Sequence, residues 1–430
     1  MMEGEVNNKF SNLPIGWEVK KLKDVAINCG DYGANAPALP YKTGDVRYIR
    51  ITDIDDYGHL ISEDKASLDE TIAQNYLLKD NDILFARTGD TVGKSLLYKS
   101  YMGRAAYAGY LIRFTLDEKQ ILPEYFDAIA KSDIFEAFKI SMKRIGAKPN
   151  INSREYGIFR FPMPLNLDEQ KGIAKLFTKV DEAIASVQNS IAAAERLKKS
   201  LMQNLLTGKM KPDGTFRTPE DFYIDEKFGK VPVGWEIKRI KDLGEILTGK
   251  TPPTDEPEVF SDKENGFMFV TPGDLDVAKY IEETERYVSE KGIRYSYVLP
   301  KGTVCEVCIG STIGKIGITT ATCCSNQQIT SVIVNNEHDA EYLYYAMLSR
   351  REHFKSVAGI NATPQINKSG YSKYRVLCPK DKLEQIAIAK GISSVDKSIN
   401  EEDKKIKSLK RLKMSLMQNL LTGKVIMRNK

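Results

Sequence analysis

The sequence predicts an α+β protein with two globular domains of mixed strands and helices. Two long helices join these domains and are expected to pair antiparallel as a coiled coil. Three observations predict this architecture: a short sequence that opens both halves of the chain, an apolar stripe of helical period that closes both halves, and strand-like and helix-like runs between them. The two halves are expected to be related by an approximate two-fold axis.

The chain contains an internal duplication. Residues 13–20 (LPIGWEVK) return as residues 231–238 (VPVGWEIK), and these segments hold both tryptophans of the protein. Residues 200–209 (SLMQNLLTGK) recur without change as residues 415–424. The repeat distance exceeds that of solenoid repeats several-fold, so it indicates a duplicated pair of domains. Fainter matches keep the same register. They pair Asp53 with Asp274, Gly93-Lys94 with Gly314-Lys315, Pro149 with Pro364 and Pro164 with Pro379.

Each half ends in a segment whose apolar residues alternate mostly in steps of three and four, as in a coiled coil. A helix of roughly 38 residues is about 57 Å long, which suits a connection between two domains. Gly208 and Gly423 follow the two segments, where glycine favours a left-handed helix end. The alternative is that each helix packs only on its own domain. The first stripe comprises Ile173, Phe177, Val180, Ile184, Val187, Ile191, Ala194, Leu197, Leu201 and Leu205; the second comprises Ile388, Ile392, Val395, Ile399, Glu402, Ile406, Leu409, Leu412, Leu416 and Leu420.

Between these landmarks the globular parts mix both kinds of local pattern. Residues 46–51 and 304–309 are strand-like, whereas residues 124–139 and 340–354 are helix-like. Residues 211–215 (KPDGT) form a polar, turn-rich linker. The predicted organisation is a first domain at 1–165, a first long helix at 166–208, a linker at 209–230, a second domain at 231–380, a second long helix at 381–424 and a tail at 425–430.

Composition places few limits on function. The 430 residues are 42% apolar and 28% charged, with a net charge of +5, which permits binding to a polyanion without requiring it. The start lacks the pattern of a secretory signal and no stretch is long and apolar enough to span a bilayer, so a cytoplasmic location is expected. Among six cysteines, Cys305 and Cys308 lie at an odd offset in a strand-like run, which favours buried free thiols over a metal site.

No catalytic constellation is present in the sequence. Residues 89–95 (GDTVGKS) and 310–315 (GSTIGK) have three residues between their glycines, where a nucleotide-binding loop needs four. A strand-to-strand turn is therefore expected at both places, with Lys94 and Lys315 as candidate phosphate contacts. Residues 251–254 (TPPT) lack the polar first residue and the aromatic of an amino-methyltransferase motif, and none of the three histidines is repeated between halves. The sequence predicts a non-enzymatic chain without catalytic or metal-binding residues.

The duplicated pattern resembles a known family. Two variable domains, each opened by Pro-x-Gly-Trp-Glu and closed by a long helix ending in LMQNLLTGK, are similar to the specificity subunits of Type I restriction-modification systems. Glu169-Gln170 and Glu384-Gln385 at the helix starts extend the resemblance over nearly the whole chain.

The resemblance implies that each variable domain is a target-recognition domain that reads one half of an asymmetric, bipartite site in double-stranded DNA. It also implies that the helices set the spacing and dock two modification subunits. Those partners bind S-adenosylmethionine and methylate adenine, and restriction/translocase subunits use ATP with Mg²⁺. No cofactor is expected on this chain, and its role is defence against foreign DNA.

Two polar segments, residues 143–152 and 359–368, are the candidate DNA contacts, because Asn and Gln can bond adenine edges while Lys and Arg suit guanine or phosphate. Surface loops without a ligand are the alternative. The candidate DNA-binding residues are Lys94, Lys143, Arg144, Lys148, Asn150, Asn152, Lys315, Asn361, Thr363, Gln365, Asn367 and Lys368. Candidates for contact with a partner helix or a partner subunit are Gln203, Leu206, Gln418 and Leu421.

The sequence leaves two rival functions open. The chain could instead be a solitary DNA-binding or regulatory protein without a methyltransferase partner, or a scaffold whose terminal domains bind proteins. Electrophoretic mobility shift of DNA with and without a co-purifying methyltransferase subunit separates these two functions from that of a specificity subunit.

Overall fold

The computed structural model describes residues 10, 12–142, 148–359 and 364–427. The chain divides into two compact units. Unit 1 consists of Met1–Gln188 with Lys404–Lys430, and unit 2 consists of Asn189–Asp403. Each unit therefore holds one globular domain and one half of each long helix.

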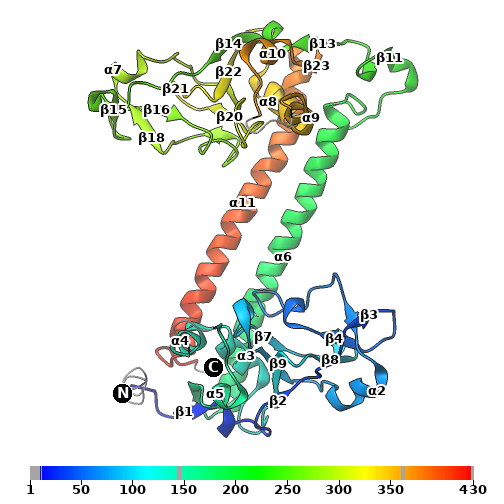
Figure 1. Ribbon diagram of the computed structural model, residues 1–430, viewed down its shortest axis with the longest axis vertical. Coiled ribbons are helices and arrows are strands. Elements are labelled where there is room, and N and C mark those ends of the chain that lie inside the picture. Colours follow the sequence, from blue (N-terminus) through cyan, green and yellow to red (C-terminus); the bar gives the residue numbers. More distant parts are fainter. Residues whose placement is uncertain (1–9, 11, 143–147, 360–363, 428–430) are drawn as a thin grey trace. The chain divides into compact units, whose positions relative to one another are not determined.

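Unit 1 contains two four-stranded sheets and a two-stranded ribbon (Figure 1). The first sheet has the order β2-β9-β6-β7, the second has the order β3-β5-β4-β8, and the ribbon is β1-β10. The strands are β1 Trp17–Lys21, β2 Asp31–Tyr32, β3 Leu39–Pro40, β4 Arg47–Ile49, β5 Ala66–Ser67, β6 Ile83–Ala86, β7 Ser95–Leu97, β8 Ala105–Tyr107, β9 Leu111–Phe114 and β10 Arg160–Pro164. The helices are α2 Glu70–Ala73, α3 Pro123–Ala130, α4 Asp133–Ser141, α5 Ser153–Gly157 and the long α6 Leu167–Leu205.

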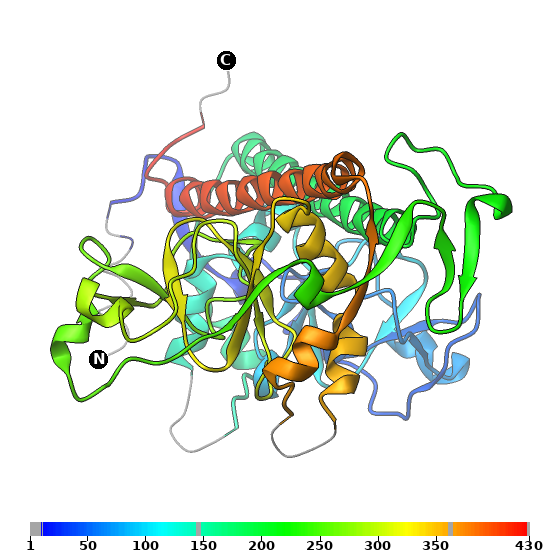
Figure 2. The same ribbon diagram turned by 90° about the horizontal axis from the view of Figure 1, so that it is seen from above.

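Unit 2 repeats this plan, with sheets β14-β22-β19-β20-β17 and β15-β18-β16-β21 and the ribbon β13-β23 (Figures 1 and 2). The strands are β13 Trp235–Arg239, β14 Gly244–Thr248, β15 Phe260–Ser261, β16 Phe267–Val270, β17 Tyr280–Ile281, β18 Arg286–Val288, β19 Val304–Val307, β20 Ile316–Thr319, β21 Cys323–Ser325, β22 Ile329–Val334 and β23 Arg375–Pro379. The helices are α7 Glu290–Ile293, α8 Ala340–Ser349, α9 Arg351–Val357, α10 Lys368–Lys373 and the long α11 Lys382–Leu420. The expected linker carries a hairpin of β11 Phe222–Asp225 and β12 Gly229–Pro232.

The α+β prediction is confirmed, with two local corrections. The helix expected at 124–139 is two helices, because α3 ends with Lys131 as its C-cap and Ser132 caps the start of α4 by accepting a hydrogen bond from the Ile134 amide. The helix expected at 340–354 is likewise divided, at Arg350, into α8 and α9.

The repeated motifs meet at the start of each long helix. The Trp17 indole donates to Glu169 in unit 1, and the Trp235 indole donates to Glu384 in unit 2. The next residue in each motif, Gln170 or Gln385, is fully buried and hydrogen-bonds backbone groups of its own domain. These contacts fix the ribbon, the domain and the helix start together, which explains why both halves share these residues.

The helix ends meet the opening motif of the other half. Gly208 and Gly423 have φ values of +67° and +71°, the left-handed conformation predicted for them. A Cβ at Gly423 would lie 2.6 Å from Pro14 Cδ, and a Cβ at Gly208 would lie 2.2 Å from Pro232 Cγ. Glycine is therefore required both by the backbone and by the close approach of these prolines.

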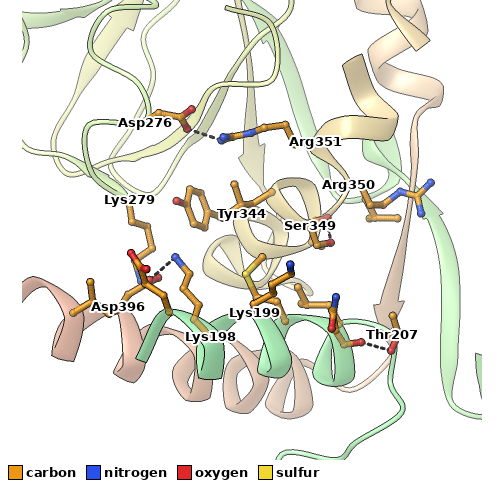
Figure 3. Close-up of a pocket in the computed structure, with 18 of the residues that line it drawn as sticks. Lys198, Lys199, Thr207, Asp276, Lys279, Tyr344, Ser349, Arg350, Arg351 and Asp396 are labelled. Carbon is orange, nitrogen blue, oxygen red and sulfur yellow. Dashed lines mark hydrogen bonds and ion pairs between the residues drawn. The ribbon is translucent and has the colours of Figure 1, made fainter. Parts of the chain in front are cut away.

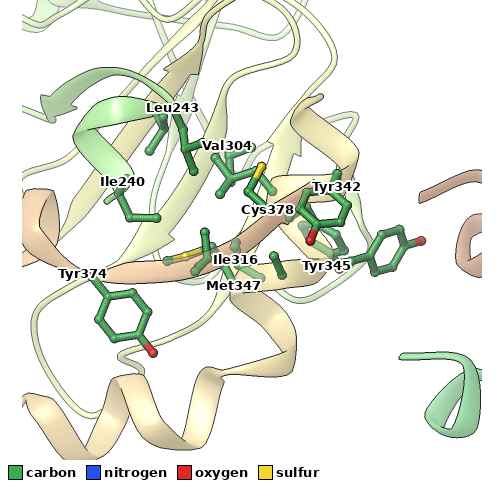
Figure 4. Packing of buried hydrophobic residues seen from close by; sticks show 14 of the residues in the cluster. Ile240, Leu243, Val304, Ile316, Tyr342, Tyr345, Met347, Tyr374 and Cys378 are labelled. Atoms are coloured by element: carbon green, nitrogen blue, oxygen red, sulfur yellow. The ribbon is translucent and has the colours of Figure 1, made fainter. Parts of the chain in front are cut away.

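Within each unit the two helix halves run antiparallel and share the domain core. In unit 1, Ile173 and Phe177 of α6 belong to the same buried cluster as Met417 and Leu420 of α11. In unit 2, the corresponding cluster joins Leu205 of α6 with Ile388 and Ile392 of α11 and with the globular domain. Figure 4 shows the part of this cluster that lies in the globular domain, including Tyr342 and Cys378. The helices thus pack on each other and on both domains, so the predicted antiparallel pairing is confirmed and the alternative, that each helix packs only on its own domain, is wrong.

The apolar stripe departs from its prediction at one repeated position. Leu197 and Leu412, both assigned to the stripe, have exposed fractions of 51% and 48%. Val187 and Ile392, by contrast, are buried as predicted.

Candidate nucleic-acid interface

In unit 1 the segment 89–94 is the turn between β6 and β7, as the sequence predicts. Gly89 and Gly93 have positive φ, and the Gly93 amide donates to the Ala86 carbonyl at 2.9 Å. Unit 2 has the same turn at 310–315, where the Gly314 amide donates to the Val307 carbonyl at 2.9 Å. The geometry in both units is that of the predicted strand-to-strand turn.

The polar loop of each domain lies against this turn. In unit 1 the Gly89 amide donates to the Pro149 carbonyl at 3.0 Å and the Ile151 amide donates to the Arg87 carbonyl at 2.9 Å. The two segments were predicted separately as candidate contacts, and the structure joins them at one place.

The same backbone hydrogen bonds occur in unit 2. The Gly310 amide donates to the Pro364 carbonyl at 2.9 Å and the Ile366 amide donates to the Cys308 carbonyl at 2.9 Å. We call this turn-and-loop region the junction of each domain: residues 87–94 with 148–153 in unit 1, and residues 308–315 with 364–368 in unit 2.

Several predicted contacts lie at the surface of the junctions. Lys148 and Asn150 are exposed in unit 1, and Gln365 and Lys368 are exposed in unit 2. Asn150 also forms a backbone bridge with Thr88. The predicted residues Lys143, Arg144, Asn361 and Thr363 lie outside the described residues.

Two predicted asparagines have a structural task. The Asn152 side chain accepts a hydrogen bond from the Glu155 amide and caps α5, and the Asn367 side chain accepts from the Gly370 amide and caps α10. Their side-chain oxygens are thus already engaged by the helix that follows each loop.

The two predicted lysines contact their own chain. The Lys94 ammonium pairs with Asp56 at 2.8 Å and donates to the Ile54 carbonyl at 3.3 Å. The Lys315 ammonium donates to the Pro272 carbonyl at 3.4 Å. Lys94 thus ties its turn to the loop after Asp53, and Lys315 ties its turn to the segment just before Asp274.

Sequence reasoning missed three exposed or half-buried residues at the first junction. Arg87 directly follows β6, and its guanidinium carbon lies 4.9 Å from the centre of the Tyr32 ring. Tyr32 and Tyr110 have exposed fractions of 41% and 59%. The only local signal was an arginine at the end of an apolar strand, and nothing in the sequence indicated that Tyr32 would meet it.

Each unit also has a groove beside its long helices. In unit 2 a groove of about 840 Å³ is lined by both helices, by the loop after Asp274 and by α8 and α9. Its side chains include the Lys198–Asp396 pair at 2.5 Å and the Arg351–Asp276 pair at 2.6 Å (Figure 3). The matching groove of unit 1, about 1020 Å³, contains Asp181 and Lys413, which pair at 2.6 Å.

The four predicted docking residues separate into two kinds. Gln203 and Gln418 are exposed, whereas Leu206 and Leu421 have exposed fractions of only 6% and 0%. Leu206 and Leu421 belong to the cores of their own units. The prediction that these two leucines contact another subunit is therefore corrected, because other residues of the same chain cover them.

The cysteines of the second domain are buried free thiols, as predicted for Cys305 and Cys308. Burial raises the pKa of the Cys305 thiol to about 12, so the thiol stays protonated and unreactive. In the described part of the chain no group of three or more His, Cys, Asp or Glu residues is arranged to hold a metal ion. No helix there is long and apolar enough to cross a membrane.

Comparison with known proteins identifies the family of the chain. The family model for the Type I restriction modification DNA specificity domain matches twice, at residues 14–196 and 232–411. The chain belongs to this family. It is thus a DNA specificity subunit, and such subunits are non-catalytic components of Type I systems.

Individual relatives agree with this assignment. The chain is 31% identical to the HindI specificity subunit of Haemophilus influenzae, over 45% of this chain and 42% of that one. It is 24% identical to the MjaVIII specificity subunit of Methanocaldococcus jannaschii, over 82% of this chain and 81% of that one.

Solved structures support the fold of the specificity subunit. The S subunit of a Type I restriction-modification system from M. genitalium superposes with a TM-score of 0.62 at 14% identity, covering 95% of this chain and 96% of that one. A chain from a type I R-M system gives a TM-score of 0.55 at 17% identity and is covered completely.

Proposed function

We propose that each globular domain reads one half of a bipartite, asymmetric DNA site through its junction. The observation that carries this proposal is the pair of junctions, which have matching backbone hydrogen bonds and different side chains. Shared backbone geometry with divergent exposed side chains is what two readers of different base sequences need.

The exposed cations fit this reading. Lys148 and Arg154 in the first domain and Lys368 in the second are available to phosphates, which position a protein on DNA, while Asn150 and Gln365 offer amides to base edges. Lys143, Arg144, Asn361 and Thr363 belong to the same loops and remain part of the proposal.

The long helices are proposed to hold the two readers apart and to dock two modification subunits. The repeated sequence 200–209 and 415–424 supports the docking role, because in both copies it exposes the same serine, glutamine and lysine. The asparagine and threonine of each copy also make the same side-chain hydrogen bonds to the helix. Two like surfaces, one in each unit, suit two copies of one partner.

The partners complete the activity in this proposal. Modification subunits bind S-adenosylmethionine and methylate adenine on both strands, and restriction/translocase subunits use ATP with Mg²⁺. The assembly acts in the cytoplasm, where it meets foreign DNA.

Exchange of one domain tests the proposal. Replacing residues 14–165 with the matching region of a relative is expected to change one half of the methylated sequence and to leave the other half unchanged. The motif is read by mapping methylated adenines in a host that expresses the chain with its modification subunits. A chimaera that alters both halves would show joint reading. A purified complex that contains no methyltransferase subunit and still binds DNA specifically would favour a solitary DNA-binding protein.

A further inference from the structure

The equivalent positions of the two junctions carry different chemistry. The Arg87 amide donates to the Tyr110 carbonyl at 3.0 Å, and the Cys308 amide donates to the Gln328 carbonyl at 2.8 Å. Together with the loop hydrogen bonds, this pairing makes Arg87 equivalent to Cys308 and Tyr110 equivalent to Gln328. The first domain therefore has a cation where the second has a thiol with an exposed fraction of 1%.

Arg87 lies directly after the last residue of strand β6. Phe85, two residues earlier on β6, points into the core, so Arg87 continues the same sheet face beyond it. Its cross-strand neighbour is Tyr110, and Tyr32 reaches the same face from β2 through its pairing with Ile112. The guanidinium thus lies over the Tyr32 ring, which remains partly open to solvent.

The guanidinium of Arg87 has no polar partner in the part of the chain that the structure describes. Among the described residues it donates to no acceptor and forms no ion pair, whereas Arg50, Arg104 and Arg113 of the same unit each pair with a carboxylate. The Tyr32 ring orients it instead, and the Tyr32 hydroxyl is itself held by the Ser153 amide at 3.2 Å. An oriented arginine without a polar partner among the described residues is prepared for an external acceptor.

We infer that Arg87 reads a guanine in the half-site of the first domain, with Tyr32 as its positioning residue. A planar guanidinium offers two parallel donors that match O6 and N7 of guanine in the major groove. Phosphate contact is the less favoured alternative, because the exposed Lys148 and Arg154 already lie at or next to the junction and suit that purpose. The inference rests on the proposed function, since it assumes that the junction faces DNA.

The test uses the full chain with the modification subunits that co-purify with it. Binding is measured against the methylated motif of the wild type and against duplexes in which each base pair of that motif is replaced in turn. Arg87→Ala is expected to lower affinity for the intact site about 10- to 100-fold and to remove discrimination at one guanine of one half-site. Arg87→Lys keeps the charge and loses the paired donors, so it should recover affinity for non-specific DNA without recovering that discrimination.

An arginine of the same domain that lies outside the junction supplies the control. Arg104→Ala, at an exposed position paired with Glu70, should leave discrimination unchanged throughout both half-sites. Preserved discrimination in the other half also shows that the Arg87 variants are folded and assembled. The inference is overturned if Arg87→Ala weakens all duplexes equally, which would indicate a phosphate contact, or if it changes nothing. Failure of the wild-type complex to select any bipartite sequence would instead reject the proposed function.

Discussion

At the scale of single residues, the Glu-Gln motif explains how each long helix is joined to its domain. The Gln170 side chain accepts a hydrogen bond from the Leu122 amide at 2.8 Å and donates to the Gln120 and Pro164 carbonyls at 3.0 and 2.9 Å. All three partners are backbone groups, and the buried Pro164 carbonyl in particular would otherwise be unsatisfied away from water.

Removing that side chain should therefore be costly. Gln170→Ala is expected to destabilise unit 1 by about 2–4 kcal/mol, since it leaves buried backbone groups without partners and creates a cavity. Urea denaturation followed by circular dichroism measures this, and Gln188→Ala, at an exposed position of the same helix, is the control. Equal stabilities of the two variants would mean that solvent replaces the lost hydrogen bonds.

A second residue, Glu306 on β19, gives unit 2 a distinct dependence on pH. Its equivalent in unit 1 is Phe85, which stacks on Tyr156 with ring centres 4.9 Å apart. Glu306 has an exposed fraction of 1%, and burial raises its pKa to about 8, although nearby Tyr371 and Arg351 oppose that shift. The folded protein thus keeps this carboxyl group protonated at neutral pH.

The sign of the stability effect follows from that pKa. Between about pH 4.5 and pH 8 the unfolded chain releases the Glu306 proton while the folded chain retains it, so stability falls as pH rises through this window and then levels off. Glu306→Gln is expected to remove this fall, which is on the order of a few kcal/mol. Urea denaturation in a Trp17→Phe background reports on unit 2 through Trp235, and Glu282→Gln is the exposed control. An unchanged pH dependence in the Glu306 variant would contradict the assignment.

At the scale of elements, the two cross-helix ion pairs are equivalent in sequence and differ in surroundings. Asp396 pairs with Lys198 at 2.5 Å and also accepts a hydrogen bond from the buried Tyr345 hydroxyl at 2.5 Å. Asp181 pairs with Lys413 at 2.6 Å, and its side chain is 41% exposed. The repeat thus offers a matched comparison of a half-buried network with a surface pair.

We expect Asp396→Ala to cost about 2–3 kcal/mol, because the Tyr345 hydroxyl loses its acceptor as well as Lys198 its counter-ion. Asp181→Ala should cost under about 1 kcal/mol, as is usual for exposed pairs. Urea denaturation at low salt checks both values. It is repeated with Lys198→Ala, Lys413→Ala and the corresponding double mutants, so that double-mutant cycles give the energy of each ion pair. Similar costs at the two sites would show that Tyr345 adds nothing.

The sequence predicts the helices and strands better than it predicts the contacts between them. The helices predicted at 166–208 and 381–424 are observed at Leu167–Leu205 and Lys382–Leu420, because an apolar period and a terminal glycine are local signals. The same stripe misassigned Leu197 and Leu412, since periodicity marks a face of the helix without showing what covers it. Arg87 escaped prediction for a related reason: its surroundings come from β2, β9 and the loop at 148–153, which are distant in the chain.

At the scale of the whole molecule, both long helices pass from one unit into the other. α6 begins in unit 1 and ends in unit 2, whereas α11 begins in unit 2 and ends in unit 1. Lys198 lies as far beyond Asp181 in α6 as Lys413 lies beyond Asp396 in α11, so both ion pairs are compatible with one antiparallel register. If the helices set the distance between the two readers, lengthening both at the same level should lengthen the gap in the DNA site.

The insertion of one heptad after Gln188 and another after Lys405 makes this change while keeping both ion pairs and the phase of the apolar stripe. Each helix grows by about 10 Å, which at about 3.4 Å per base pair should favour a non-specific gap about three base pairs longer with both half-sites unchanged. The readers would also turn around the duplex by about a third of a turn or slightly less, so affinity should fall even at the best new spacing. Mapping of methylated adenines reads the gap directly, and insertion in α6 alone, which breaks the register, should abolish specific methylation. If the double insertion keeps the original gap at full efficiency, the spacing is set by the docked modification subunits and the helices serve only to join the units.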